Sequence, residues 1–117
     1  MIGTDILSFR RLRSVFNKFP SRIIDKILTH PEKEQYMALG SEKRCLEYLG
    51  GRFCGKEAIF KAVPNAALTW KRVSIISQPS GRPQIVIDGN FVKDIEVSIS
   101  HEDDYVIATA IQFNKTC

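Results

Sequence analysis

Residues 41–63, SEKRCLEYLGGRFCGKEAIFKAV, carry the pattern of one long helix. Ser41 is suited to cap its first turn, because the hydroxyl can accept a bond from an unpaired backbone N–H group. Pro64 cannot continue a helix, so the helix is expected to end just before it. Apolar side chains recur between these limits with a period of about 3.6 residues. They are Leu46, Leu49, Phe53 and Phe60.

Glu57 falls in the middle of this apolar stripe. A carboxylate there costs free energy unless a cation compensates it. Lys61 lies four residues further, one turn along and on a neighbouring line of the helix. Two interpretations are open: a buried Glu57–Lys61 pair that holds the helix in register, or a metal ligand beside a lysine that handles phosphate or a proton. Spacing alone favours the ion pair, because such pairs are common on helices.

The composition indicates an ordinary globular protein, and we expect a single domain over residues 1–117. The chain is 44% hydrophobic and 26% charged. No apolar run approaches the roughly 20 residues that span a bilayer, and no leader-like segment opens the chain. The net charge of +4 predicts an acidic partner, which leaves nucleic acid, a phosphorylated small molecule or an acidic protein.

The cysteines are predicted to be free thiols in a reducing compartment, because Cys45, Cys54 and Cys117 form no CxxC pair. A zinc site is not predicted, since neither His30 nor His101 has a cysteine at ligand spacing.

The remaining pattern predicts an α+β fold, with helices in the first half and a small antiparallel sheet in the second. Shorter helices are expected at residues 8–18, 22–28 and 31–39, and strands at 1–6, 73–77, 84–87, 96–101 and 105–113. The helix at 8–18 has a basic side, which is either simply solvated or a docking surface. Its basic residues are Arg10, Arg11, Arg13 and Lys18.

Two further polar residues stand out at strand ends. Asp5 follows Gly3 and is either a turn former or a carboxylate presented at a sheet edge. His101 ends its strand on the apolar side, where by itself it would be a core histidine. Asp5, His101, Glu57 and Lys61 all conflict with a simple inside–outside pattern, and such conflicts gather at functional sites.

Several blocks of this sequence resemble the holo-acyl-carrier-protein synthases, the small class of 4′-phosphopantetheinyl transferases. The blocks are GTDI at the start, GRFCGKEAIFKA in the long helix and VSISHEDDYVIATAI near the end, with LTHPEKEQY and SGRPQI between them. The resemblance covers nearly the whole chain in the right order. It favours the metal-ligand interpretation of Glu57 over the ion pair.

The resemblance implies a magnesium-dependent enzyme that moves the phosphopantetheine arm of coenzyme A to a serine of an acyl carrier protein, in support of fatty acid synthesis. Adenosine 3′,5′-bisphosphate is released. Asp5 and Glu57 match the family's Mg²⁺ ligands, and Lys61 matches a lysine that faces the pyrophosphate. His101 matches a histidine near the nucleotide and its 3′-phosphate, while Arg52 either contacts the nucleotide or pairs with a carboxylate. The proton of the serine passes to Glu57 or to a metal-bound water.

The resemblance also implies how partners bind. Arg11, Arg22 and Arg44 align with arginines that meet the acidic helix of the carrier protein. Members of this class are trimers with sites between subunits, which suits a sheet too small to bury both of its faces alone. Neither nucleic acid nor a membrane is expected as a partner.

The chain departs from the bacterial pattern after the long helix. Where bacterial members have a Gly-Thr-Gly loop, this chain has residues 63–67, VPNAA, followed by LTW. The variant loop favours the mitochondrial branch and the mitochondrial matrix, with the bacterial cytoplasm as the alternative. A non-catalytic basic module that binds an acidic protein or nucleic acid is the other function considered. A catalytically silent relative that only binds a carrier protein is a third, and the presence of all four polar residues argues against it.

Overall fold

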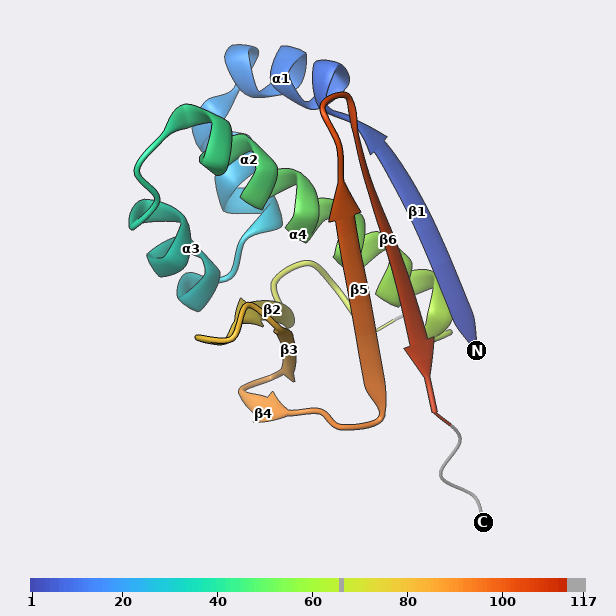
Figure 1. Cartoon of the computed structure of the whole chain (residues 1–117). Helices are drawn as coiled ribbons and strands as arrows, with labels where there is room; N and C mark the ends of the chain where they lie inside the picture. The colour runs from blue at the N-terminus through green and yellow to red at the C-terminus, as the bar shows by residue number, and fades with distance from the viewer. Residues whose placement is uncertain (66, 114–117) are drawn as a thin grey trace.

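The helix α4 (Glu42–Ala62) lies against one face of a three-stranded antiparallel sheet (Figure 1). The computed structural model describes residues 1–65 and 67–113. The other elements are β1 (Ile2–Ser8), α1 (Phe9–Lys18), α2 (Pro20–Ile27), α3 (His30–Met37), β2 (Val73–Ser77), β3 (Pro83–Ile87), β4 (Asn90–Phe91), β5 (Ile95–His101) and β6 (Tyr105–Gln112). The predicted α+β class is confirmed.

The limits of α4 follow from the residues that flank it. The Ser41 hydroxyl accepts a hydrogen bond from the backbone N–H of Arg44 at 3.2 Å. The helix ends at Ala62, and the backbone turns to an extended conformation at Val63, directly before Pro64. Both predicted ends of the long helix are therefore confirmed.

The strands form two sheets instead of the one predicted for the second half of the chain. The larger sheet has the order β1-β6-β5, and the smaller has the order β2-β3-β4. The strand β1 pairs with β6 from the other end of the chain, with Asp5 opposite Ala108. Alternating polarity identifies a strand but not its partner across such a separation, so the sequence pattern could not assign β1 to this sheet.

Small residues bring α4 close to the larger sheet. On the helix, the residues of this kind are Gly51, Cys54, Gly55, Ala58 and Ala62, all of them buried. On β6, the buried residues beneath the helix are Val106, Ala108 and Ala110. The short side chains on both sides leave little space between helix and sheet, so side chains from β1 and α4 meet directly.

A buried ion pair between α4 and α3 also connects both helices to β2. Lys56 of α4 and Glu32 of α3 are both fully buried, with Nζ and Oε1 2.6 Å apart. Lys56 Nζ also donates to the carbonyl oxygens of Ile27 at 2.6 Å and Trp70 at 3.0 Å. Glu32 Oε2 accepts from the backbone N–H of Ile75 on β2 at 2.7 Å. This pair therefore holds α3, α4 and β2 in one arrangement.

Among the described residues, none of the helices combines the length and the apolar character needed to cross a bilayer. Cys45 and Cys54 are free thiols, as predicted, while Cys117 lies outside the described residues.

Candidate active site

A carboxylate from β1 and two charged side chains from α4 meet at one side of the helix–sheet contact. Asp5 sits on the face of β1 that is turned toward α4, two residues after the buried Gly3. Lys61 Nζ lies 3.1 Å from Asp5 Oδ1 and donates to the Thr4 carbonyl oxygen at 2.9 Å. The Lys61 side chain remains about half exposed, so it is accessible to a ligand.

Glu57 lies one turn before Lys61 and close to Asp5. Its pKa is raised, first by burial and second by the negative charge of Asp5, while Lys61 opposes the shift. Within residues 1–65 and 67–113, Lys61 forms its ion pair with Asp5 and none with Glu57. The interpretation of Glu57–Lys61 as a structural pair is therefore wrong, and Glu57 keeps both oxygens available.

This donor set fits a magnesium ion. The negative charge of Asp5 raises the pKa of Glu57, so the two carboxylates repel each other, and a cation bound between them would relieve this repulsion. The described part of the chain holds no cluster of three or more histidine, cysteine or acidic residues that could enclose a metal. Two carboxylates without further protein ligands suit Mg²⁺, which usually takes one or two carboxylates and completes its shell with phosphate oxygens and waters.

A second group of polar residues lines a separate cavity of about 280 Å³ beside the start of α4. Arg52 is buried there, and its Nε donates to the Ile75 carbonyl oxygen at 2.9 Å. Its guanidinium also donates to Ser77 Oγ at 2.7 Å and lies 3.9 Å from the centre of the Tyr48 ring. Burial raises the pKa of Tyr48 to about 12 and lowers that of Arg52. Arg52 therefore bonds to a carbonyl and a hydroxyl instead of the carboxylate that the sequence allowed.

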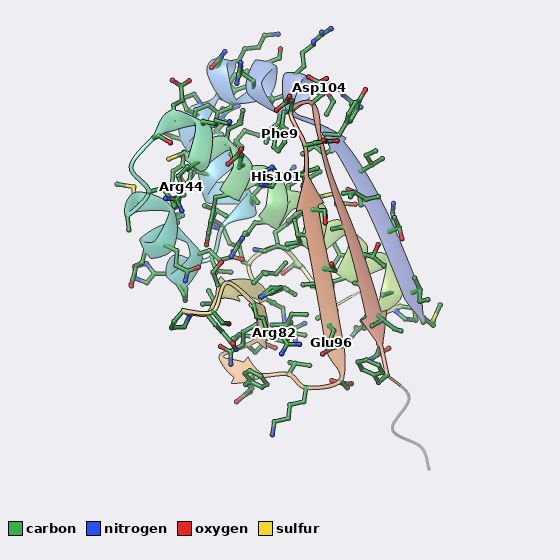
Figure 2. The ribbon with its side chains drawn as sticks, viewed as in Figure 1. Phe9, Arg44, Arg82, Glu96, His101 and Asp104 are labelled. Atoms are coloured by element: carbon green, nitrogen blue, oxygen red, sulfur yellow. The ribbon has the colours of Figure 1, made fainter. Side chains whose placement is uncertain are left out.

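His101 lies at the mouth of the same cavity and is not a core residue. Its side chain is 45% exposed, with Nδ1 3.8 Å from Glu47 Oε2 and the ring edge-on to Phe9. Figure 2 shows His101 close to Phe9. Arg44, on the first turn of α4, lies further to the left in the same view. The predicted core position is wrong because Glu47 of α4 and the Phe9 ring, which lie beside His101, leave nearly half of its side chain open to solvent.

The structure therefore brings Asp5, Glu57 and Lys61 together and places His101 and Arg52 elsewhere. His101 is beside Glu47, and Glu57 follows Glu47 by ten helical residues, or about 15 Å along the axis. Within one chain, a small ligand group cannot contact both sets at once.

The three arginines expected at a partner surface also divide into two locations. Arg11 is exposed on α1, and Arg22 is exposed on α2, with its guanidinium 5.5 Å from the centre of the Phe19 ring. Phe19 and Val15 are themselves exposed, so this corner offers apolar and basic groups together. Arg44 instead lines the cavity that contains Arg52 and His101.

The sequence interpretation missed Lys56, Glu32 and Cys54. Thr29 and Glu32 form a capping box, with Glu32 Oε1 accepting from the Thr29 N–H at 2.9 Å, and this spacing is visible in the sequence. The partner of Glu32 is 24 residues away, and no local pattern connects the two. Cys54 was predicted only to be a free thiol, and the structure adds that this thiol donates to the Asp5 carbonyl oxygen at 3.1 Å.

Comparison with known proteins agrees with the family resemblance that the sequence blocks showed. Residues 1–110 match the 4′-phosphopantetheinyl transferase superfamily. A holo-[acyl-carrier-protein] synthase of Halalkalibacterium halodurans is 41% identical over 112 residues, which cover 93% of this chain and 91% of the relative. One from Exiguobacterium sibiricum is 37% identical over 113 residues, covering 94% and 85%.

Solved structures agree with this match. The holo-[acyl-carrier-protein] synthase of Neisseria meningitidis superposes with a TM-score of 0.84 at 28% identity, covering 97% of each chain. The synthase of Bacillus anthracis in complex with CoA (3′,5′-ADP) gives a TM-score of 0.79 at 25% identity, covering 97% of this chain and 96% of that one.

The chain belongs to the 4′-phosphopantetheinyl transferase superfamily. Within it, the similarity is to the holo-[acyl-carrier-protein] synthases, as the sequence blocks implied. The two curated relatives named above are bacterial, so the preference for a mitochondrial location is not supported.

Proposed function

We propose that this protein transfers the 4′-phosphopantetheine group of coenzyme A to a serine of an apo acyl carrier protein. The observation that carries the proposal is the Asp5–Lys61 ion pair at the helix–sheet junction, with Glu57 within the electrostatic influence of both charges, in a chain from this family. The bacterial cytoplasm is the compartment that fits its relatives. Supply of holo carrier protein for fatty acid synthesis is the role that follows.

The reaction exchanges one P–O bond for another. The serine oxygen of the carrier protein attacks the phosphorus that bears the pantetheine arm, and the bond from that phosphorus to the bridging oxygen breaks. Adenosine 3′,5′-bisphosphate leaves with the bridging oxygen, and the serine proton passes to Glu57 or to water. The nucleophile belongs to the partner, so this chain needs no nucleophilic side chain of its own.

Each charged residue of the cluster has a task in this exchange. Asp5 and Glu57 would hold Mg²⁺, which when bound neutralises the diphosphate and stabilises charge on the leaving oxygen. The accessible ammonium of Lys61 is a point charge that can stabilise or protonate the leaving phosphate. Thr4 and Asp5 orient Lys61 until a phosphate competes for it.

The nucleotide end of coenzyme A is assigned to the separate cavity. Arg44, Arg52 and His101 line it and supply hydrogen-bond donors for a phosphate, and Tyr48 stacks on Arg52. The family resemblance implies sites between subunits, so we infer that the cavity of a neighbouring chain takes the nucleotide end of a coenzyme A molecule whose diphosphate lies at the Asp5–Lys61 cluster.

The outer face of the larger sheet supports such an assembly. Ile2 and Ile6 of β1 are 65% and 62% exposed, and Ile107 of β6, opposite Ile6, is 43% exposed. These apolar side chains face away from α4 and are uncovered in a single chain. Two further copies in a trimer would cover the faces of all three sheets at once.

The test of the activity is mass spectrometry of an apo acyl carrier protein incubated with coenzyme A, Mg²⁺ and this protein. The expected result is a gain of one phosphopantetheine per carrier, which EDTA abolishes. No gain, with no effect of EDTA, would instead favour a binding module without catalysis.

The shared site predicts complementation between two inactive variants. Glu57→Gln removes a carboxylate of the cluster, and Arg52→Ala removes a donor of the cavity. If one site takes residues from two chains, mixing and reassembling the two variants restores measurable transfer, because some sites receive neither substitution. Transfer that stays at the level of the separate variants, in mixed trimers confirmed by native mass spectrometry, would contradict a site between chains.

We expect the exposed Arg11 and Arg22 to form the surface that docks the carrier protein, and this docking surface predicts a selective effect of Arg11→Glu. Reversing this exposed charge removes attraction to an acidic carrier helix, so the KM for the carrier should rise about tenfold, while the KM for coenzyme A stays unchanged. Lys26→Glu makes the same change in net charge on α2 and is the control. Equal losses toward both substrates would remove Arg11 from the docking surface.

A further inference from the structure

We propose that Gly3 and Cys54 are positioning residues that fix the separation of the Asp5 and Glu57 carboxylates and thereby select a small divalent cation. The proposal rests on the function proposed above, because it concerns the same pair of carboxylates. Neither residue touches a substrate. Both act through the backbone of β1.

Gly3 is the point where β1 touches the backbone of α4. A Cβ atom at this position would overlap the carbonyl oxygen of Ala58 and lie 2.6 Å from the backbone nitrogen of Ala62. It would also lie 2.8 Å from Cβ of Lys61. Two of these three neighbours are backbone atoms of a helix, which cannot rotate away. Any side chain at position 3 must therefore push β1 and α4 apart.

The consequence reaches Asp5 directly. Gly3 and Asp5 are two residues apart on one strand, so they share the face that is turned toward α4. Glu57 and Lys61 flank Ala58, the residue whose carbonyl oxygen Gly3 approaches. A displacement of β1 at Gly3 therefore moves the Asp5 carboxylate away from both of its partners on α4.

Cys54 ties the same strand to the same helix at a second point. Its thiol donates to the Asp5 carbonyl oxygen at 3.1 Å and lies 3.6 Å from the Val106 carbonyl oxygen. Cys54 is fully buried, so water does not compete for this hydrogen bond. Cys54 precedes Glu57 by three residues on a rigid helix. One helical turn therefore carries both the anchor of Asp5 and the carboxylate opposite it.

The separation of two carboxylates matters for the choice of cation. Mg²⁺ requires oxygen ligands at about 2.0–2.1 Å in near-octahedral geometry, whereas a larger ion such as Ca²⁺ accepts about 2.3–2.6 Å and irregular geometry. Mn²⁺, like Mg²⁺, prefers oxygen ligands in octahedral geometry. A pair of carboxylates held close by a glycine contact suits the smallest ion, and a wider pair suits a larger one.

The experiment measures metal affinity as well as activity. Binding of Mn²⁺ to the full chain with coenzyme A present is followed by electron paramagnetic resonance, and Mg²⁺ and Ca²⁺ are measured by competition. For Gly3→Ala we expect at least about a tenfold loss of Mg²⁺ affinity, a smaller loss for Ca²⁺, and a higher ratio of Mn²⁺- to Mg²⁺-supported kcat. Cys54→Ala should change these quantities in the same direction by less.

Gly55→Ala is the matched control. It adds the same methyl group to α4, but the new atom meets the ends of the Ile75 and Ile99 side chains, at 2.7 and 3.2 Å, which can move. Its metal preference should equal that of the wild type.

A longer acidic side chain at position 5 provides a rescue that would not occur if Gly3 had only a structural role. Asp5→Glu alone should weaken Mg²⁺ binding. In the Gly3→Ala background, the extra methylene should recover part of the lost affinity, because it spans the wider gap.

Several outcomes would overturn the proposal: Gly3→Ala with wild-type metal affinities, loss of activity without any change in metal preference, or no recovery in the double variant. If Gly3→Ala does not fold, Cys54→Ala decides, and unchanged affinities in that variant overturn the proposal. A wild-type chain that binds no Mn²⁺ and transfers no phosphopantetheine would instead refute the proposed function.

Discussion

Replacing Glu57 with glutamine should lower the kcat/KM of phosphopantetheine transfer by about 10³-fold or more. Metal-assisted stabilisation of a leaving phosphate contributes several kcal/mol, and each 1.36 kcal/mol corresponds to a factor of ten in rate. Glutamine keeps the shape of the Glu57 side chain but removes its negative charge. The side chain at position 57 therefore no longer binds Mg²⁺ as a carboxylate. The measurement is initial rates of carrier modification by mass spectrometry at several Mg²⁺ concentrations.

The same substitution should leave the fold as stable as the wild type or make it more stable. The folded pKa of Glu57 is raised above that of an ordinary glutamate, about 4.3. The ionised side chain therefore opposes folding at neutral pH, and the opposition disappears as the pH falls through the folded pKa and then the unfolded one. At pH 7 the Tm of Glu57→Gln should equal or exceed that of the wild type, with the difference shrinking in acid.

Glu42→Gln is the control for this prediction, because Glu42 is an exposed residue on the first turn of the same helix. Its rate should equal that of the wild type. Full activity of Glu57→Gln would refute the metal-ligand role. A large fall in its Tm would indicate that Glu57 is structural.

Replacing Lys56 with methionine should produce the largest loss of stability among the substitutions considered. The change leaves Glu32 as a fully buried carboxylate without its cation, and it removes the donor to the Ile27 and Trp70 carbonyl oxygens. Breaking a buried pair on one side costs about 3–5 kcal/mol. For a chain of this length, that corresponds to a fall in Tm of about 10–20 °C, measurable by calorimetry.

Two comparisons separate the buried charge from other effects of the substitution. Lys33→Met breaks the pair of Lys33 with the exposed Asp25 and should change the Tm little. The double variant Lys56→Met/Glu32→Gln removes both charges and should recover part of the loss. A Lys56→Met protein with the wild-type Tm would contradict the bridging role of this pair.

Local sequence was sufficient to predict the long helix, whereas the proposal that Asp5 and Glu57 are metal ligands came from the family resemblance. Ser41 and Pro64 act on the backbone next to them, so local chemistry determines both ends of α4. Asp5 and Glu57 were paired through the family resemblance, because nothing local places the two residues together. Their contact depends on the packing of β1 against α4.

The sequence pattern misplaced His101 and did not reveal the Lys56–Glu32 pair. Both failures have one cause, because the burial of a side chain depends on the complete fold. His101 shares a face of β5 with the buried Ile95 and Val97, yet Glu47 of α4 and Phe9 leave its side chain 45% exposed. Lys56 lies beside Glu57 in the sequence, and periodicity could not show that Lys56 is the residue with the buried acidic partner. That partner, Glu32, comes from α3, and only the complete fold brings the two within 2.6 Å.

The pairing of the first strand with the last has a consequence during protein synthesis. Ala108, the neighbour of Asp5 across the ladder, is added to the growing chain about a hundred residues after Asp5. The hydrogen-bonding edge of β1 therefore stays without its native partner while the residues between β1 and β6 are added. The larger sheet, which positions Asp5 against α4, therefore cannot form until β6 has been synthesised, and until then β1 presents an unpaired strand edge.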